Sequence, residues 1–141
     1  MTRPRQTSFQ PAVFLTKMGA KSVIARFREG QAICSQGDAS KEVFYIEKGQ
    51  VKVTVNSKRG KETVLAILNH GNYLGAGCMT GEAFFTASAT AITGCTILVI
   101  EKSEMTLALH NGHEFSDHFI ACLLAISPTE QRILATYTDL A

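Results

Sequence analysis

The chain lacks an excess of charge of either sign, a long apolar run and closely spaced cysteines. Its 14 basic and 12 acidic residues leave a formal net charge of +2 over 141 residues. Nucleic-acid-binding proteins owe much of their affinity to lysines and arginines that neutralise phosphates, and a nearly balanced chain lacks that footprint. We interpret the basic run at residues 58–61 (KRGK) as a solvated turn and expect no direct contact between this chain and nucleic acid.

No stretch of about 18 consecutive apolar residues occurs, which excludes a transmembrane helix. The basic N-terminus (MTRPRQTSFQ) is not followed by the apolar region of a signal peptide. We therefore expect a cytoplasmic protein without a membrane partner. Hydrophobic residues make up 45% of the chain and charged residues 18%, which is typical of one globular domain with its own core.

The cysteines are scattered along the chain, at Cys34, Cys78, Cys95 and Cys122. Zinc and iron–sulfur sites need closely spaced ligands, and no C-x-x-C pair is present. We interpret the cysteines as reduced, mostly buried thiols that pack as small hydrophobes. The sequence therefore predicts neither a structural metal nor a disulfide framework.

A polar cluster near residue 114 is the nearest approach to a metal site. Glu114 and His118 are four residues apart, on one face of a predicted helix, with His110, His113 and Asp117 close by. Because so few ligands on one helix rarely hold zinc or nickel, we interpret the cluster as a polar helix face. Cupin-type metal ligands, nucleophile elbows, P-loops and Rossmann glycines are also missing, so we do not expect an enzyme.

Between residues 22 and 101, apolar and polar side chains alternate with a period of two, most clearly at Val51, Val53 and Val55. β-branched alternation broken by Gly, Asn and Asp is typical of short antiparallel strands. Turns are predicted at residues 28–30, 36–38, 48–50, 57–61 and 69–72. The pattern predicts a mainly β fold, an antiparallel β-roll or jelly roll (double-stranded β-helix) with flanking helices, and it does not fit a parallel sheet.

Helices are predicted near both ends of the chain. The first covers about residues 13–18 and ends at Gly19. Ser103 is expected to cap a helix that ends at Asn111-Gly112, and a second helix covers about residues 113–125.

A helix-start signature follows at residues 127–130, where Ser127 caps, Pro128 takes the first helical position and Glu130 bonds back to the cap. It predicts a further short helix at residues 128–138, bent away from the one before it. We divide the chain into a flexible arm (1–10), a β-roll domain (11–112) and a C-terminal helical segment (113–141).

The glycines of the predicted turns form a spaced pattern. Residues 27–31 (FREGQ) lead to residues 36–38 (QGD), then to residues 43–51 (VFYIEKGQV) and to residues 71–91 (GNYLGAGCMTGEAFFTASATA). Over about residues 22–124 this pattern resembles the sensor domain of the Crp/Fnr family of bacterial transcription regulators. The resemblance implies a cyclic-nucleotide-binding β-roll that couples ligand occupancy to a C-terminal helix, and through it to dimerisation or DNA binding.

Residues 71–91 resemble the phosphate-binding cassette of that family, in which a Glu binds the ribose hydroxyl and an Arg binds the phosphate. Here Ala76 stands in place of the Glu and Phe85 in place of the Arg. Gly75 and Gly77 still permit close backbone approach, and Ala76 to Met79 can open a short helix. We therefore expect cyclic AMP or cyclic GMP to bind weakly or not at all. The resemblance assigns the ligand site to Gly75, Ala76, Gly77, Cys78, Phe85, Thr86, Ala87 and Ser88.

The pair Phe84-Phe85 leaves three interpretations open. The two rings fill the pocket, or line it for an apolar or aromatic ligand, or one ring joins the core while the other covers the mouth. Glu82 is a candidate replacement for the missing Glu, although it is expected on the far side of the cassette turn.

Two functions of different classes follow. One is a regulatory ligand-sensing domain; the other is a ligand-free module that binds a protein partner or a second copy through residues 113–138. An exposed stripe of Phe115, Phe119 and Leu123 would support the module, and burial of these residues would oppose it. A break at Ser127-Pro128 alters the dimer geometry that the resemblance implies. No helix-turn-helix follows within the sequence, so both a stand-alone domain and a piece of a longer regulator stay open.

Overall fold

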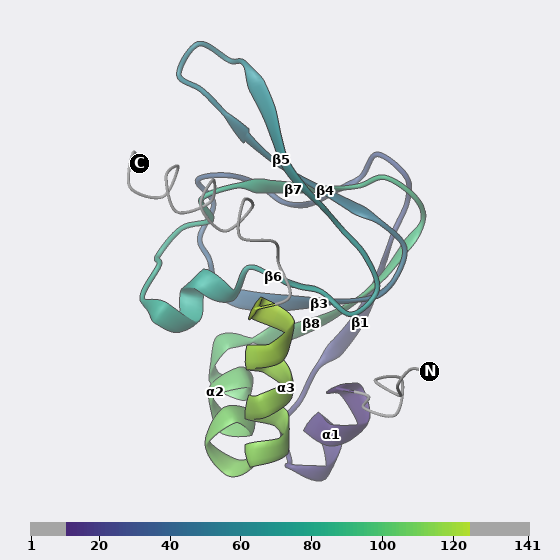
Figure 1. The fold of residues 1–141 in the computed structure, drawn as a ribbon, viewed down its shortest axis with the longest axis vertical. Coiled ribbons are helices and arrows are strands. Elements are labelled where there is room, and N and C mark those ends of the chain that lie inside the picture. The colour runs from purple at the N-terminus through teal and green to yellow at the C-terminus, as the bar shows by residue number, and fades with distance from the viewer. Residues whose placement is uncertain (1–10, 125–141) are drawn as a thin grey trace.

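The computed structural model describes residues 11–124 and shows two facing β-sheets, with the helices along the outer side of one of them (Figure 1). The predicted arm at residues 1–10, the predicted helix at 128–138 and its start at Ser127-Pro128 lie outside these residues. The elements in chain order are α1 (Pro11–Lys17), β1 (Val23–Phe27), β2 (Ala32–Cys34), β3 (Glu42–Lys48), β4 (Val51–Asn56), β5 (Glu62–Leu68), β6 (Tyr73–Leu74), the 3-10 helix η2 (Ala76–Thr80), β7 (Ser88–Ala91), β8 (Cys95–Glu101), α2 (Lys102–Asn111) and α3 (His113–Leu124).

Each sheet has four strands, in the orders β1-β8-β3-β6 and β2-β7-β4-β5. All neighbouring strands pair antiparallel. The prediction of an antiparallel β-roll with flanking helices is therefore confirmed, with two open sheets rather than a closed barrel. The predicted turns at residues 28–30, 36–38, 57–61 and 69–72 fall between the strands, and the turn at 48–50 overlaps only the last residue of β3, Lys48.

Strand β3 shows how the sheets and helices share the core. Val43 and Tyr45 face the helices, in a cluster with Leu15 of α1 and Phe115 of α3. Phe44 and Ile46, on the opposite face, belong to a second cluster between the two sheets. Because successive side chains of a strand point to opposite faces, a continuous apolar run is what a strand buried on both sides requires.

The start of α2 differs from the prediction. Ser103 does not cap the helix; Glu101 occupies the cap position with extended backbone, and no side chain makes a capping hydrogen bond. The reason is that β8 runs into α2 without a loop, which leaves Ser103 inside the first turn. The helix ends at Asn111-Gly112 as predicted.

Candidate functional site

A cavity of about 240 Å³ lies between the sheet β2-β7-β4-β5 and the cassette segment that joins β6 to β7. The sheet contributes one wall from strands that are distant in sequence. The cassette contributes the other wall, including η2. The lining residues are Cys34, Ser40, Val53, Ala66, Leu68, Tyr73, Leu74, Gly75, Ala76, Gly77, Glu82, Phe84, Phe85, Thr86, Ala87, Ser88 and Ala89.

The structure brings together all of the predicted site residues except one. Gly75, Ala76, Gly77 and the run from Phe85 to Ser88 line the cavity. Cys78 does not line it, because its side chain is only 1% exposed and packs in the cluster that faces the helices. Ala76 also packs against this cluster, but it remains among the residues that line the cavity.

The backbone of the cassette keeps the close approach that its glycines predict. Gly75, at the start of η2, has a left-handed φ of 78°, and Gly81 at its end has a φ of 100°. A Cβ atom on Gly75 would lie 3.0 Å from the Glu42 carbonyl oxygen and 3.3 Å from Cε1 of Phe85. A side chain here would strain the backbone and crowd both neighbours. The expected short helix from Ala76 is thus present.

The cassette arm after η2 is tied to the loop between β2 and β3. The Gly37 amide donates to the Phe85 carbonyl oxygen at 2.9 Å, and the Phe85 amide donates to that of Asp38 at 2.9 Å. The Gln36 amide donates to the Ser88 hydroxyl oxygen at 2.8 Å. These bonds hold the two phenylalanines and Ser88 at the cavity wall.

The two phenylalanines line the cavity rather than fill it. Phe85 is partly buried and packs against Phe44 of the inter-sheet cluster, with ring centroids 6.1 Å apart. Phe84 is 59% exposed. The interpretation in which both rings close the pocket is therefore wrong, since a cavity remains between them and the sheet.

Glu82 is the one charged residue among the described residues that line the cavity. Its amide donates to the Gly77 carbonyl oxygen at 3.0 Å, and a Cβ on Gly77 would lie 3.0 Å from Cγ of Glu82. The expectation that Glu82 lies on the far side of the cassette turn is wrong, because the chain reverses at Gly81 and brings Glu82 back across Gly77. No lysine, arginine or histidine appears in the described lining.

The thiols near the cavity carry no charge at neutral pH. Burial raises the pKa of the Cys34 thiol to about 11, and the Asp38 carboxylate adds to this rise, while a backbone hydrogen bond with Ala89 opposes it. Burial also raises the pKa of Cys78, against the opposing effect of a hydrogen bond with Ser40. The polar side-chain groups of the described residues that line the cavity are therefore one carboxylate, hydroxyls and a neutral thiol.

The polar cluster near residue 114 does not converge on a common point. No group of three metal-ligating side chains that could hold an ion occurs within residues 11–124. His118 turns inward, with ring contacts to Tyr45, Tyr73 and Phe115, and its Nδ1 lies 3.5 Å from the Tyr73 hydroxyl oxygen. Burial lowers its pKa. Glu114 remains exposed.

The apolar stripe that an interaction module would expose lies on α3. It is buried at the two positions whose side chains the structure describes. Phe115 is 0% exposed and Phe119 is 6% exposed. The Phe115 ring stacks on Phe14 with centroids 5.4 Å apart, and Phe119 meets Tyr73 edge-on at 4.9 Å. The side chain of Leu123 lies outside the description.

Among the described helices, none is long and apolar enough to span a bilayer.

A protein-family model described as cyclic nucleotide-binding domain matches residues 24–111. The cyclic AMP receptor protein of Thermus thermophilus is 28% identical over 99 residues, which are 70% of this chain and 45% of that protein. The match with this relative and with the transcriptional regulator CRP of Salmonella typhimurium, which is 33% identical over 52 residues, spans 45% and 25% of those proteins, so the chain spans less than half of their length.

Solved structures share the fold at lower identity. The catabolite activator protein of Thermus thermophilus has a TM-score of 0.69 and 22% identity, with 92% of this chain and 56% of that chain covered. The sensor domain of the transcriptional regulator DNR from Pseudomonas aeruginosa has a TM-score of 0.67 and 21% identity, with 86% and 80% covered.

Proposed function

The chain belongs to the cyclic nucleotide-binding domain family, in the form found in Crp/Fnr-type regulators, and we propose that its pocket has lost the two groups that hold a cyclic nucleotide. In this proposal the chain is the ligand-sensing regulatory domain of a transcription regulator, and cyclic AMP binds it weakly or not at all. Its partner is a small-molecule effector. Dimerisation involves the C-terminal helices, and DNA is contacted by other parts of the regulator.

The observation that carries the proposal is the absence of a cation from the described cavity wall at the cassette. Phe85 stands where the family has its arginine, and Ala76 stands where it has its glutamate. An arginine forms a charge-assisted, bidentate pair with phosphate, at about twice the strength of a neutral hydrogen bond. Its loss should weaken cyclic-nucleotide binding by about 30- to 1000-fold.

The regulatory part of the proposal rests on the position of Tyr73. Tyr73 is among the residues that line the cavity, and its ring lies on the helix-facing side of β6, where it contacts His118 and Phe119 of α3. A ligand that shifts Tyr73 would therefore act directly on the helix that leads toward the C-terminus. Coupling of this kind requires that the ligand prefers one of two arrangements of that helix.

A reversion tests the proposal. The double variant Ala76→Glu/Phe85→Arg should gain about 30- to 1000-fold in affinity for cyclic AMP over the unaltered chain, because it restores the phosphate cation and the ribose acceptor. The measurement is isothermal titration of both proteins, with thermal melts to show that each is folded.

The matched control is Ala76→Glu/Phe85→Gln, which makes the same site polar without a cation and should gain little. If the folded double variant binds no cyclic AMP, or if the glutamine control binds as well as the arginine variant, the cavity is not a cassette that lacks only its charged ligands.

A further inference from the structure

The charge inside the cavity has the opposite sign to that of a phosphate site. Glu82 supplies a carboxylate to the described lining, and no basic side chain there opposes it. The one ion pair within residues 11–124 joins Lys52 to Glu62, so Glu82 takes part in none there. A carboxylate in a mostly apolar cavity favours a positively charged partner and repels an anion.

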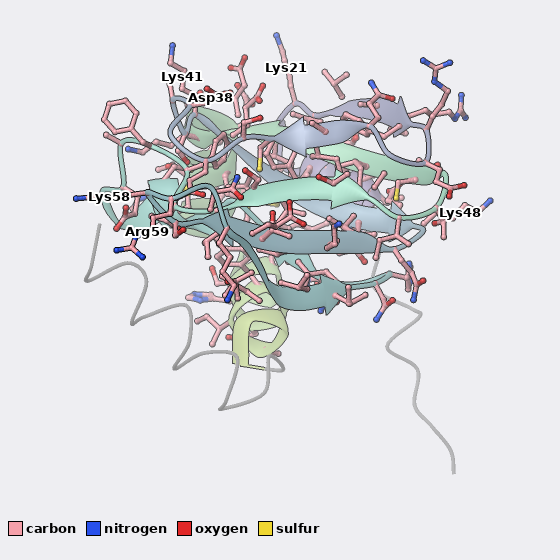
Figure 2. All side chains as sticks on the ribbon, turned by 90° about the horizontal axis from the view of Figure 1, so that it is seen from above. Lys21, Asp38, Lys41, Lys48, Lys58 and Arg59 are labelled. Atoms are coloured by element: carbon pink, nitrogen blue, oxygen red, sulfur yellow. The ribbon has the colours of Figure 1, made fainter. Side chains whose placement is uncertain are left out.

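A second carboxylate acts on the same wall. Asp38 lies on the loop that holds the cassette arm, and its charge adds to the rise in the pKa of Cys34, which lines the cavity. Asp38 is exposed and does not line the cavity, so Glu82 is the carboxylate of the described lining. Lys41 lies beside Asp38, and Lys58 and Arg59, between β4 and β5, point outward from the roll (Figure 2). Charges in open solvent are screened strongly by salt.

The size and walls of the cavity indicate the body of the ligand. An engineered apolar cavity of about 150 Å³ holds benzene, so the present cavity of about 240 Å³ has room for roughly ten non-hydrogen atoms, the size of a bicyclic ring. Its walls carry Val53, Leu68 and Leu74 and the aromatic residue Phe85. Aromatic faces attract both flat rings and organic cations.

On the premise that this cavity is the sensor pocket proposed above, we propose that it binds a small aromatic amine in its protonated form. The flat ring lies between the apolar residues of the sheet and Phe85, and the ammonium group donates to the Glu82 carboxylate. Glu82 is then the residue that selects the ligand by charge. The cavity thus discriminates against cyclic phosphates in favour of cations.

Three indole compounds of nearly equal size test the proposal: tryptamine, a cation at neutral pH; tryptophol, which is neutral; and indole-3-acetate, an anion. The chain has no tryptophan, so indole fluorescence reports the probe alone. Tryptamine should bind about tenfold more tightly than tryptophol, because a charge-assisted hydrogen bond is stronger than a neutral one. Indole-3-acetate should bind most weakly of the three.

The variant Glu82→Gln keeps the size and polarity of the side chain and should remove the preference for tryptamine over tryptophol. Glu29→Gln, in the exposed turn between β1 and β2, makes the same change in net charge away from the cavity and should leave the preference intact. Equal affinities for the three probes, a preference for indole-3-acetate, a preference that survives Glu82→Gln, or no binding of any probe at millimolar concentration would overturn the proposal.

The cyclic AMP reversion and the indole probe series test different proposals, so the failure of one can be distinguished from the failure of the other. If Ala76→Glu/Phe85→Arg gains cyclic AMP affinity while the indole series shows no preference by charge, the cassette is intact and the aromatic-amine proposal alone is wrong. If the series follows the predicted order while the reversion gains nothing, the cavity binds aromatic amines but is not a cassette that lacks only its charged ligands.

Discussion

Phe14 of α1 packs its ring so close to Gly112 that a side chain cannot fit there. A Cβ atom on Gly112 would lie 2.5 Å from Cζ and 2.8 Å from Cε2 of Phe14. The φ of Gly112 is −139°, which any residue adopts, so the need for glycine is steric. This contact fixes the distance between α1 and the junction of α2 with α3.

Gly112→Ala should therefore destabilise the fold by about 1–3 kcal/mol, because the extra methyl group displaces Phe14 or shifts the helices. Urea unfolding followed by circular dichroism measures this change. Gly94→Ala is the matched control, since Gly94 has no positive φ and no atom within 4 Å of its Cβ position. The steric explanation is wrong if the two variants unfold at the same urea concentration.

A residue of the site could be predicted where the evidence for it lies within one continuous segment of the sequence. It could not be predicted where its position depends on how the chain folds back. Gly75, Ala76 and Phe85 were expected at the site from the resemblance of one continuous segment to a phosphate-binding cassette, and the structure places all three at the cavity. The position of Glu82 does not follow from spacing, because it depends on how the chain reverses at Gly81 after η2. Local sequence cannot report such a reversal unless the turn type is known.

At the scale of elements, α3 is attached to the roll through a cluster of aromatic rings. His118 contacts Tyr45 of β3 and Tyr73 of β6, and Phe119 contacts Tyr73 from the next position. The lowered pKa of His118 means that the folded protein holds a neutral imidazole here. A proton on this ring would place a charge inside the cluster, which burial disfavours.

The stability of the fold should accordingly fall as the pH drops below about 6.5, the ordinary pKa of histidine. Above that pH the imidazole is neutral in both states and contributes nothing. Below it the unfolded chain takes up a proton that the folded chain does not, until the pH reaches the lowered folded pKa. His118→Gln should remove this part of the acid destabilisation.

Urea unfolding at about pH 7.5 and about pH 5.5 measures the difference. His113→Gln, at an exposed position of the same helix, serves as the control and should lose as much stability in acid as the unaltered chain. If His118→Gln also loses that amount, the imidazole is not the group responsible.

Strands and helices could be predicted where a pattern of neighbouring residues specifies them. Alternation at Val51, Val53 and Val55 predicts β4, and the glycines of the turns bound the strands around it. The cap at Ser103 was predicted wrongly because a capping residue normally follows a loop, and here a strand leads directly into the helix. The sequence pattern does not predict which strands pair, because alternation does not identify a strand's partners. It therefore could not predict that one cavity wall consists of β2, β4, β5 and β7.

At the scale of the whole molecule, the sheet β2-β7-β4-β5, which forms one wall of the cavity, and the helical layer lie on opposite sides of the sheet that contains β3, β6 and β8 (Figure 1). Tyr73 spans this separation, since it lines the cavity and packs in the cluster under α3. The fold thus retains the arrangement that a sensor needs, with a cavity on one side of a sheet and a helix on the other. The described lining of this cavity has a carboxylate and no cation.

Isothermal titration of the unaltered chain with cyclic AMP and with cyclic GMP, at moderate salt, tests this account most directly. We predict no measurable heat at micromolar ligand and an unchanged melting temperature, because no cation in the described cavity wall can pair with the phosphate. Micromolar binding of either nucleotide would contradict the account, since it would mean that backbone amides and the hydroxyls of Thr86 and Ser88 hold the phosphate without a charged partner.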